Sequence, residues 1–384
     1  MKARRIASVI ASLGICVVII SLTACTPASP TSVSSAGHAG TQRTVSPGAR
    51  KIGDVPEKRG WFDLHFINET EGWLADAKHL WRTADGGRSW EIVHTADDRK
   101  STQRIRKVEF RNSRAGWVLG HDGLYKTEDQ GHALTRLPTP LDYPKGELNS
   151  FTFLEDGKVG WAVGGIYRKI SSEELRQGKH PNNAVTTFPD DSHAVLEAAV
   201  FGTNDGGNRW YRESIPGGNY RIYDVYFSNA KHGLAIGDGG ALFTRDGGKA
   251  WKVAVFRKEC VDPKFLELYD HRPVAASFVQ PDLGWLSFDD GRLAKSTDGG
   301  QTWCDLLRPE SGWPEGEQNA YFQNIHFINP TRGWGLKANG KLYETNDGGS
   351  TWVGVSETRF DDMYFLDGRL GWAVGEEGLF LINP

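Results

Sequence analysis

Residues 333–337 read Gly-Trp-Gly-Leu-Lys, residues 345–352 read Thr-Asn-Asp-Gly-Gly-Ser-Thr-Trp, and versions of this pair of segments recur along the whole chain. The opening glycine stands at seven positions: Gly72, Gly116, Gly160, Gly233, Gly284, Gly333 and Gly371. The aspartate of the second segment, here called the Asp box, stands at six: Asp85, Asp129, Asp205, Asp246, Asp298 and Asp347. A self-similar unit of this length indicates one supersecondary motif used repeatedly.

Each unit predicts four short strands. Alternating segments such as 324–327, the Gly-Trp segments, short apolar segments such as 341–344 and the residues after the box tryptophan are separated by Gly, Asn and Asp. Seven such units predict an all-β fold, a seven-bladed β-propeller with four-stranded blades. The seventh unit supplies three strands, so we expect a strand near Arg50–Val55 to pair with the strand at Leu379 and close the ring.

The N-terminus predicts export and lipid attachment. Residues 1–24 hold three basic side chains followed by an apolar run, and Leu22-Thr23-Ala24-Cys25 resembles a bacterial lipobox with Cys25 as the lipidated residue. An ordinary signal peptide and a membrane anchor helix are the alternatives. Residues 25–48 are rich in Ser, Thr, Pro, Gly and Ala, which is typical of a flexible tether, and residues 49–384 are predicted to form the propeller. The predicted location is extracytoplasmic: outer membrane or periplasm, or a lumen in a photosynthetic host.

Charge and cysteine content limit the function. The whole chain carries a net charge of −3, and without residues 1–24 the charge becomes −6, which argues against a nucleic-acid partner. Cys260 and Cys304 are the two cysteines that follow the predicted lipidated Cys25. Outside the cytoplasm such a pair suggests a disulfide, with two separate thiols as the alternative.

Carboxylates in this chain invite an enzymatic interpretation. The Asp box also occurs in sialidases and other glycosidases, and Asp122, Asp238 and Asp290 precede glycines in the turns between the second and third strands. Asp-Gly is equally a preferred hairpin turn, so we assign these residues to turns. The Phe-Arg-Ile-Pro-like stretch of sialidases is absent, and the Asp190–His193 cluster lacks the spacing of a metal motif. We therefore predict no catalytic residues, no metal and no cofactor.

Spacing locates the predicted binding surface. The glycine-to-aspartate separation is 13 or 14 residues in five units but 45 in the third, where residues 165–200 form a predicted loop insertion. The segments from one unit to the next vary throughout. In a propeller all these irregular connections open on one face, where binding surfaces are commonly built. Residues of the types favoured at protein interfaces lie in these connections. The predicted partner-binding residues are Arg104, Arg106, Tyr143, Tyr220, Arg221, Tyr223, Arg257, Trp313, Tyr321 and Arg359.

The units Gly-Trp-Ala-Val-Gly at 160–164 and 371–375, together with Thr-x-Asp-Gly-Gly-x-x-Trp, resemble the photosystem II stability/assembly factor family over residues 55–384. That resemblance implies a non-catalytic, lipid-anchored propeller that binds a protein client, such as a subunit of a membrane complex, through an arginine-rich patch. The insertion and the cysteine pair depart from the family pattern, which leaves the client open. A sialidase-like or other glycan-binding or glycan-hydrolysing propeller is the alternative.

Overall fold

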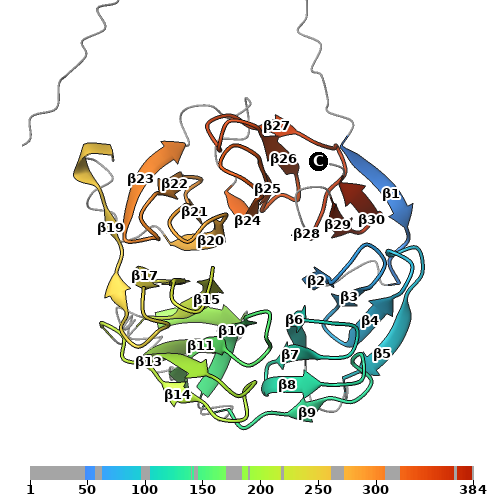
Figure 1. Ribbon diagram of the computed structural model, residues 1–384, viewed down its shortest axis with the longest axis horizontal. Helices are drawn as coiled ribbons and strands as arrows, with labels where there is room; N and C mark the ends of the chain where they lie inside the picture. Colours follow the sequence, from blue (N-terminus) through green and yellow to red (C-terminus); the bar gives the residue numbers. More distant parts are fainter. Residues whose placement is uncertain are drawn as a thin grey trace, which may run out of the picture. The chain divides into compact units, whose positions relative to one another are not determined.

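The described part of the chain in this computed structural model comprises residues 48–56, 63–96, 104–139, 141, 146–169, 184–188, 191–217, 220–260, 272–307, 321–366 and 370–382. These residues all belong to the second of two compact units, Val45–Pro384. Their strands form seven sheets arranged as the blades of a ring (Figure 1). The predicted seven-bladed β-propeller is confirmed.

Within each blade, four strands pair antiparallel from the centre of the ring outward, and blades 3 and 5 each carry one additional strand. Blade 1 contains β2 (Asp63–Phe66), β3 (Gly72–Ala75), β4 (His79–Thr83) and β5 (Glu91–Thr95). Blade 2 contains β6 (Ile105–Phe110), β7 (Gly116–Gly120), β8 (Gly123–Thr127) and β9 (Thr135–Arg136). Blade 3 contains β10 (Gly146–Phe153), β11 (Gly160–Lys169), β12 (Ala184–Phe188), β13 (Asp191–Thr203) and β14 (Tyr211–Arg212). Blade 4 contains β15 (Ile222–Phe227), β16 (Gly233–Gly237), β17 (Gly240–Thr244) and β18 (Lys252–Val253).

The remaining blades complete the ring. Blade 5 contains β19 (Val255–Phe256), β20 (Pro273–Phe278), β21 (Gly284–Phe288), β22 (Leu293–Ser296) and β23 (Thr302–Leu307), and the 3-10 helix η2 (Lys258–Cys260) follows β19. Blade 6 contains β24 (Phe322–Phe327), β25 (Gly333–Lys337), β26 (Leu342–Thr345) and β27 (Val353–Gly354). Blade 7 contains β28 (Asp362–Phe365), β29 (Gly371–Gly375), β30 (Gly378–Ile382) and β1 (Ala49–Gly53).

Closure of the ring joins the two ends of the propeller. Strand β1 pairs antiparallel with β30, with Arg50 opposite Leu381 and Gly53 opposite Leu379. This is the pairing expected from the sequence, and it covers the edge that β30 would otherwise expose.

The repeated glycine is required by a phenylalanine at the end of each innermost strand. Phe66 lies opposite Gly72 in the register of β2 and β3, and a Cβ added to Gly72 would lie 2.5 Å from the Phe66 ring. At all seven repeat glycines this separation is between 2.4 and 2.6 Å. A larger residue would displace the ring, so glycine is needed here for the close approach of a neighbour.

The tryptophan after that glycine joins neighbouring blades. Trp73 stacks on Phe110 of blade 2, with ring centroids 3.7 Å apart, and its indole N–H donates to the Gln130 carbonyl at 2.9 Å. Equivalent stacks occur at five further blade interfaces, formed by Trp117–Phe153, Trp161–Phe227, Trp285–Phe327, Trp334–Phe365 and Trp372–Phe66. These aromatic pairs are apolar contacts that recur at six of the seven blade interfaces.

The interface between blades 4 and 5 is built differently. Blade 4 carries Leu234 at the tryptophan position, so Phe278 of blade 5 lacks an indole partner from blade 4. Here the chain leaving blade 4 forms β19, which pairs parallel with the outer strand β23 of blade 5. A disulfide bond joins Cys260 to Cys304, whose Cα atoms are 5.2 Å apart. The strand pairing and the disulfide therefore fix the chain that leaves blade 4 to the outer strand of blade 5, at the interface where the stacked tryptophan is missing.

The Asp boxes are turns between the third and fourth strands. Asp85 Oδ1 accepts the Ser89 backbone N–H at 2.9 Å, and Thr83 Oγ1 accepts that of Gly87 at 2.8 Å. Gly86 and Gly87 have φ of +75° and +90°, which favours glycine. In each of the five other boxes, the Asp carboxylate likewise accepts the backbone N–H of the residue four positions later. These contacts are the turn chemistry that the sequence predicts.

The sequence analysis expected the insertion in blade 3 to be a loop, but part of it forms strands. Strand β11 continues as far as Lys169, which lies opposite His193 of β13. Strand β12 pairs with the beginning of β13. Extended pairing between the second and third strands satisfies the backbone of residues 165–169 and 191–200 without a separate core.

Candidate functional site

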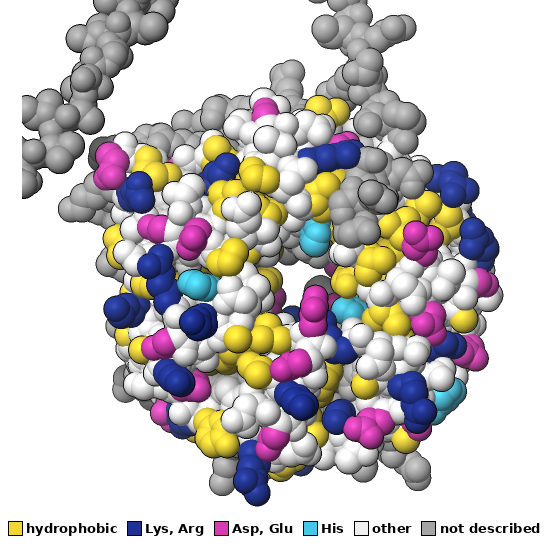
Figure 2. Space-filling model, in the orientation of Figure 1, with side chains coloured by type: hydrophobic (Ala, Val, Ile, Leu, Met, Phe, Trp, Pro, Cys, Tyr) yellow, Lys and Arg dark blue, Asp and Glu magenta, His cyan; other side chains and the backbone are white. Residues whose placement is uncertain are grey.

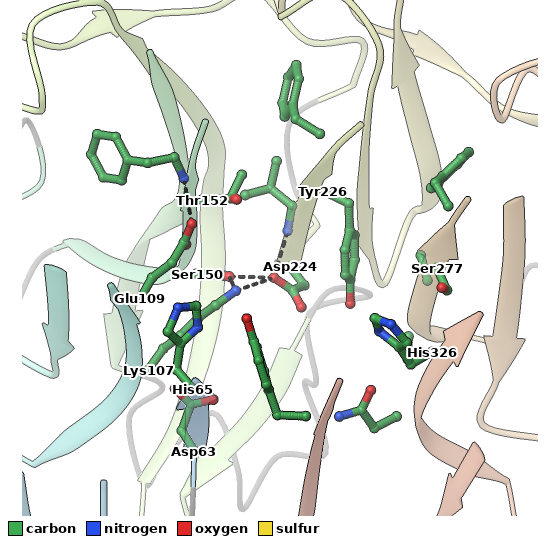
Figure 3. Close-up of a pocket in the computed structure, with 18 of the residues that line it drawn as sticks. Asp63, His65, Lys107, Glu109, Ser150, Thr152, Asp224, Tyr226, Ser277 and His326 are labelled. Carbon is green, nitrogen blue, oxygen red and sulfur yellow. Dashed lines mark hydrogen bonds and ion pairs between the residues drawn. The ribbon is translucent and has the colours of Figure 1, made fainter. Parts of the chain in front are cut away.

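A polar cavity of about 1050 Å³ occupies the centre of the ring. Figure 2 shows the ring hollowed at its centre, with acidic, basic and histidine side chains at the margin. The innermost strands of all seven blades line it, and Figure 3 shows ten of the lining side chains converging on it. We call this cavity the central channel.

Polar side chains of the channel bond each innermost strand to the next. Asp63 of blade 1 accepts the Val108 N–H of blade 2 at 2.5 Å, and Glu109 of blade 2 accepts the Phe153 N–H of blade 3 at 3.1 Å. Across the closure of the ring, Asp362 of blade 7 accepts the Leu64 N–H of blade 1 at 3.1 Å. The channel residues therefore hold the blades together as well as lining a cavity.

Two carboxylates of the channel have cationic partners: Glu109 pairs with Arg111, and Asp224 pairs with Lys107. Lys107 Nζ lies 2.8 Å from Ser150 Oγ and 3.3 Å from Asp224 Oδ1, and Ser150 also donates to Asp224 (Figure 3). This contact joins three blades through one ammonium group.

Two other carboxyls of the channel hold their protons more tightly. Burial raises the pKa of Asp63 to about 6, against the lowering effects of the Val108 N–H and of Lys107. Burial and the neighbouring Asp63 raise the pKa of Asp362 to about 8. Two carboxyls that face each other in a poorly solvated cavity cannot both ionise easily. At neutral pH this pair carries about one proton, held mainly by Asp362.

Histidines of the channel are neutral. Burial lowers the pKa of His65 and of His326 to about 4 in each case. His65 Nε2 contacts the Phe110 carbonyl at 2.8 Å, which requires the proton to be on Nε2. Both rings therefore present hydrogen-bonding groups without charge.

The irregular connections of the propeller gather on one face, as the sequence predicts. Turns between the second and third strands hydrogen-bond to the connections between blades. The His121 N–H donates to the Arg104 carbonyl at 3.2 Å, and the Asp289 N–H donates to the Arg272 carbonyl at 2.9 Å. The Asp-box turns bond instead to the turns between first and second strands, as Gly86 N does to the Thr70 carbonyl at 2.8 Å. We call these the loop face and the box face.

Arg106 is a partly enclosed cation of the loop face. Its guanidinium lies 2.7 Å from Glu147 Oε1 and also bonds the Leu148 carbonyl. Burial lowers the pKa of Arg106, and repulsion by Arg221 adds to this effect against the attraction of Glu147. Arg106 is therefore half-buried and compensated by a carboxylate of its own blade interface.

Arg221 lies close to Arg106 but has no carboxylate within ion-pair distance among the described residues. Its Nη2 donates to Asn149 Oδ1 at 3.5 Å, and its guanidinium lies 5.3 Å from the centre of the Tyr223 ring. The Tyr223 hydroxyl faces Arg272 at 3.4 Å, and Arg272 in turn pairs with Asp289 at 3.1 Å. Arg106, Arg221 and Tyr223 are thus the predicted residues that the structure brings together.

The other predicted interface residues are dispersed. Arg104, Tyr321 and Arg359 lie on the loop face at blades 2, 6 and 7. Tyr220 packs against Gly239 and donates its hydroxyl to the Pro216 carbonyl at 2.5 Å, which is a structural contact. Tyr143, Trp313, Cys25 and Asp190 lie outside the described residues.

Arg257 was placed on the loop face by the sequence, and the structure places it elsewhere. Its guanidinium lies 3.6 Å from the box carboxylate of Asp298, and its Nε donates to Thr302 Oγ1 at 2.8 Å. The reason is β19, which runs along the outer strand of blade 5 and carries Arg257 toward the box face.

The Asp residues of the loop-face turns are engaged in structure. Asp122 accepts the Tyr125 hydroxyl at 2.9 Å, Asp238 lies 3.5 Å from Arg272, and Asp290 lies 2.7 Å from Arg292 Nε. These contacts support the turn assignment over a catalytic one.

Sequence reasoning missed the central channel, although a signal for it exists. The channel is lined by the residues one and three positions before the phenylalanine that ends each innermost strand, such as His65 and Asp63 before Phe66. These positions share one face of a strand. Knowing that this face points to the ring axis would have identified them.

Comparisons with known proteins agree with the fold. Residues 46–174 match the family model described as photosynthesis system II assembly factor YCF48. This segment is about a third of the chain. No curated protein matches the chain in sequence.

Solved structures extend the similarity to nearly the whole propeller. A structure of YCF48 bound to a D1 peptide has a TM-score of 0.60 and 20% identity, covering 87% of this chain and 95% of that chain. YCF48 from Cyanidioschyzon merolae has a TM-score of 0.59 and 18% identity, covering 88% of this chain and 98% of that chain. An ancestral GH74 enzyme has a TM-score of 0.59 and 14% identity, covering 90% of this chain but only 46% of that chain. At these identities the likeness supports the fold alone.

The described residues contain neither a membrane-spanning helix nor a metal-binding cluster. No helix there has the length and apolar character needed to cross a bilayer. No group of three or more His, Cys, Asp or Glu there could hold a metal ion.

Proposed function

We propose that this protein is a non-catalytic propeller that binds an acidic, extended segment of a protein partner on its loop face. The match of residues 46–174 to the YCF48 model and the similarity to a YCF48 that holds a D1 peptide support a peptide-binding role. The D1 peptide belongs to that relative, and the partner here is defined only by its chemistry.

Arg221 is the observation on which this proposal depends. Arg106 and Arg272 each have a carboxylate within 3.1 Å, whereas Arg221 bonds only a side-chain amide and lies over an aromatic ring. A guanidinium held in this way can bind a carboxylate of the partner with two parallel hydrogen bonds. Tyr223 beside it supplies a rigid apolar surface of the type favoured at interface centres.

The test replaces Arg221 alone, since replacing Arg106 would also break its pairing with Glu147. We expect Arg221→Glu to weaken binding to acidic peptides of an array at least about tenfold, as expected for a central interface residue. It should also abolish crosslinked capture of the partner from native membranes. Arg209→Glu, at an exposed position of a box turn, is the matched control and should bind normally. Equal binding by both variants would refute the loop-face assignment.

We also propose that Cys25 carries a lipid and holds the propeller at an extracytoplasmic membrane surface. The lipobox-like sequence Leu22–Cys25 and the polar segment that follows it support this proposal. Labelling of the expressed chain with a palmitate analogue should be lost in Cys25→Ala. Retention of the label in that variant would contradict the lipidation site.

Glycan hydrolysis is the second candidate function, supported by the similarity to a GH74 enzyme and by the raised pKa of Asp362 in the channel. Glycosidases use a protonated carboxyl as the general acid. A screen of glycosides decides between the two: turnover that is abolished by Asp362→Asn would replace the non-catalytic proposal.

A further inference from the structure

The central channel contains an internal comparison between carboxyls with and without a cation. Asp224 faces the Lys107 ammonium at 3.3 Å. Asp63 and Asp362, on β2 and β28, have no cation within ion-pair distance among the described residues. Asp63 accepts one backbone N–H, while Asp362 accepts one backbone N–H and one N–H of the Asn324 amide at 3.0 Å. The fold therefore places two interacting carboxyls in one cavity without a direct ion pair, although the charge of Lys107 acts on Asp63 from farther away.

Aromatic rings form part of the wall beside these carboxyls, and the cations Lys107 and Arg111 line the channel near them. The His65 and Tyr364 rings lie 4.8 Å apart, centre to centre. His326 is half-buried, lines the channel as Tyr226 does (Figure 3), and stacks on Phe365, while its ring nitrogens make no hydrogen bond to any described residue. Aromatic faces with nearby carboxylates are the surroundings in which proteins bind ammonium groups.

We propose that the central channel binds a primary aliphatic amine, with its ammonium group between Asp63 and Asp362. The Lys107 contact shows the geometry in this same cavity, because that ammonium bridges a hydroxyl and a carboxylate of two different blades. The volume of about 1050 Å³ leaves room for the alkyl chain. Among the described residues the carboxylates and histidines do not form a metal cluster, which favours an organic ammonium over a divalent ion.

Binding should depend on pH, because the ammonium must displace a proton from the carboxyl pair. The titratable and charged groups that face this pair come from five strands and the residue after one of them. They are His65, Lys107, Glu109, Arg111, Asp224, Tyr226, His326 and Tyr364. The histidines have pKa values of about 4 and stay neutral, and burial raises the pKa of Tyr364 to about 12. Asp63 and Asp362, with pKa values of about 6 and 8, are therefore the groups that lose protons between pH 6 and pH 8.

The experiment is titration calorimetry of the full chain with n-butylamine at pH 6, 7 and 8, in two buffers of different ionisation enthalpy. We expect the affinity to rise with pH, by up to about tenfold per unit, with close to one proton released per amine at pH 7. Butan-1-ol, the uncharged analogue, should not bind. Asp362→Asn and Asp63→Asn should each weaken amine binding at least about tenfold, while Asp282→Asn on the box face should leave it unchanged.

Three results would overturn the proposal: no binding at millimolar amine, unchanged binding in the variants, or equal competition by potassium or calcium ions. Near-ultraviolet circular dichroism of the stacked tryptophans shows whether each variant is folded. If Asp362→Asn does not fold, the proton release of the unmodified chain and the Asp63→Asn variant decide the result. Loss of partner binding in Arg221→Glu is independent of all these outcomes.

Discussion

Gln130 occupies a position of the Asp box where the five other boxes have glycine. It has φ of +72° at a position where the five other boxes carry glycines with φ between +69° and +80°. A non-glycine residue in this left-handed region is strained by its Cβ, at a cost of about 1–2 kcal/mol. Its carbonyl accepts the indole N–H of Trp73, so the conformation is held by the blade interface.

Replacing Gln130 with glycine should therefore stabilise the propeller. The relief of strain exceeds the extra chain entropy of glycine, so we expect a gain of about 0.5–1 kcal/mol in the free energy of unfolding, measured with urea. Gly131→Ala is the contrasting variant: φ there is +104° and an added Cβ would lie 2.8 Å from Leu80, so it should destabilise. Equal loss of stability in both variants would contradict this account.

Asp362 makes the stability of the propeller depend on pH in an unusual direction. Its pKa rises from 3.8 in the unfolded chain to about 8 in the fold. A raised carboxyl pKa contributes stability below the unfolded value, and this contribution is lost as the pH rises toward 8.

Asp362→Asn should consequently raise the melting temperature at pH 8 more than at pH 5. Asparagine keeps the Leu64 N–H bond without the ionisation that opposes folding at high pH. Thermal unfolding of both proteins at pH 5, 6, 7 and 8 measures the difference. A constant difference across this range would show that burial of Asp362 does not govern the pH dependence.

At the scale of elements, β19 and the disulfide substitute for a missing tryptophan. They fix the chain that leaves blade 4 to β23 of blade 5, at the interface where Leu234 stands in place of the indole that stacks at the other blade interfaces. Cys260 and Cys304 are 44 residues apart, and closing a loop of this length stabilises a fold by about 3–4 kcal/mol on an entropic model.

We expect Cys260→Ser to destabilise the propeller by about this amount and Leu234→Trp to recover part of it. The recovery should be about 1 kcal/mol, the value of an added aromatic stack on Phe278. Chemical denaturation of the single and double variants measures both effects. If Leu234→Trp lowers stability in the Cys260→Ser background, the idea that the disulfide compensates for the missing tryptophan is wrong.

The same elements show what the sequence could and could not predict. The glycines, tryptophans and box aspartates predict the blades, because their roles depend on contacts within one repeat and its neighbour. The placement of Arg257 could not be predicted, because it depends on β19 pairing with a strand 47 residues later, as Val255 opposite Thr302 shows. The direction in which Asp63 and Asp362 point likewise depends on closure of the whole ring.

At the scale of the whole molecule, the ring separates two kinds of surface. The box face repeats the same turn six times, and its carboxylates are bonded within those turns. The loop face and the central channel carry the groups whose surroundings differ from blade to blade, including Arg221 and the Asp63–Asp362 pair. Repetition therefore identifies the scaffold, and departures from it identify the candidate sites.

Closure of the ring by β1 makes a prediction about the whole molecule. Deleting residues 1–54 removes β1 and leaves β30 as an uncovered edge with Leu379 and Leu381 in the last blade. Because every blade packs on two neighbours, loss of closure should weaken the entire propeller, and the exposed edge should promote aggregation.

Deleting residues 1–47 keeps β1 and serves as the control. Thermal unfolding followed by light scattering should show a melting temperature lower by several degrees for the longer deletion only, since the outer strand and the apolar contacts of Ile52 are lost. Identical melting of the two truncated chains would show that the other six blades hold the ring without β1.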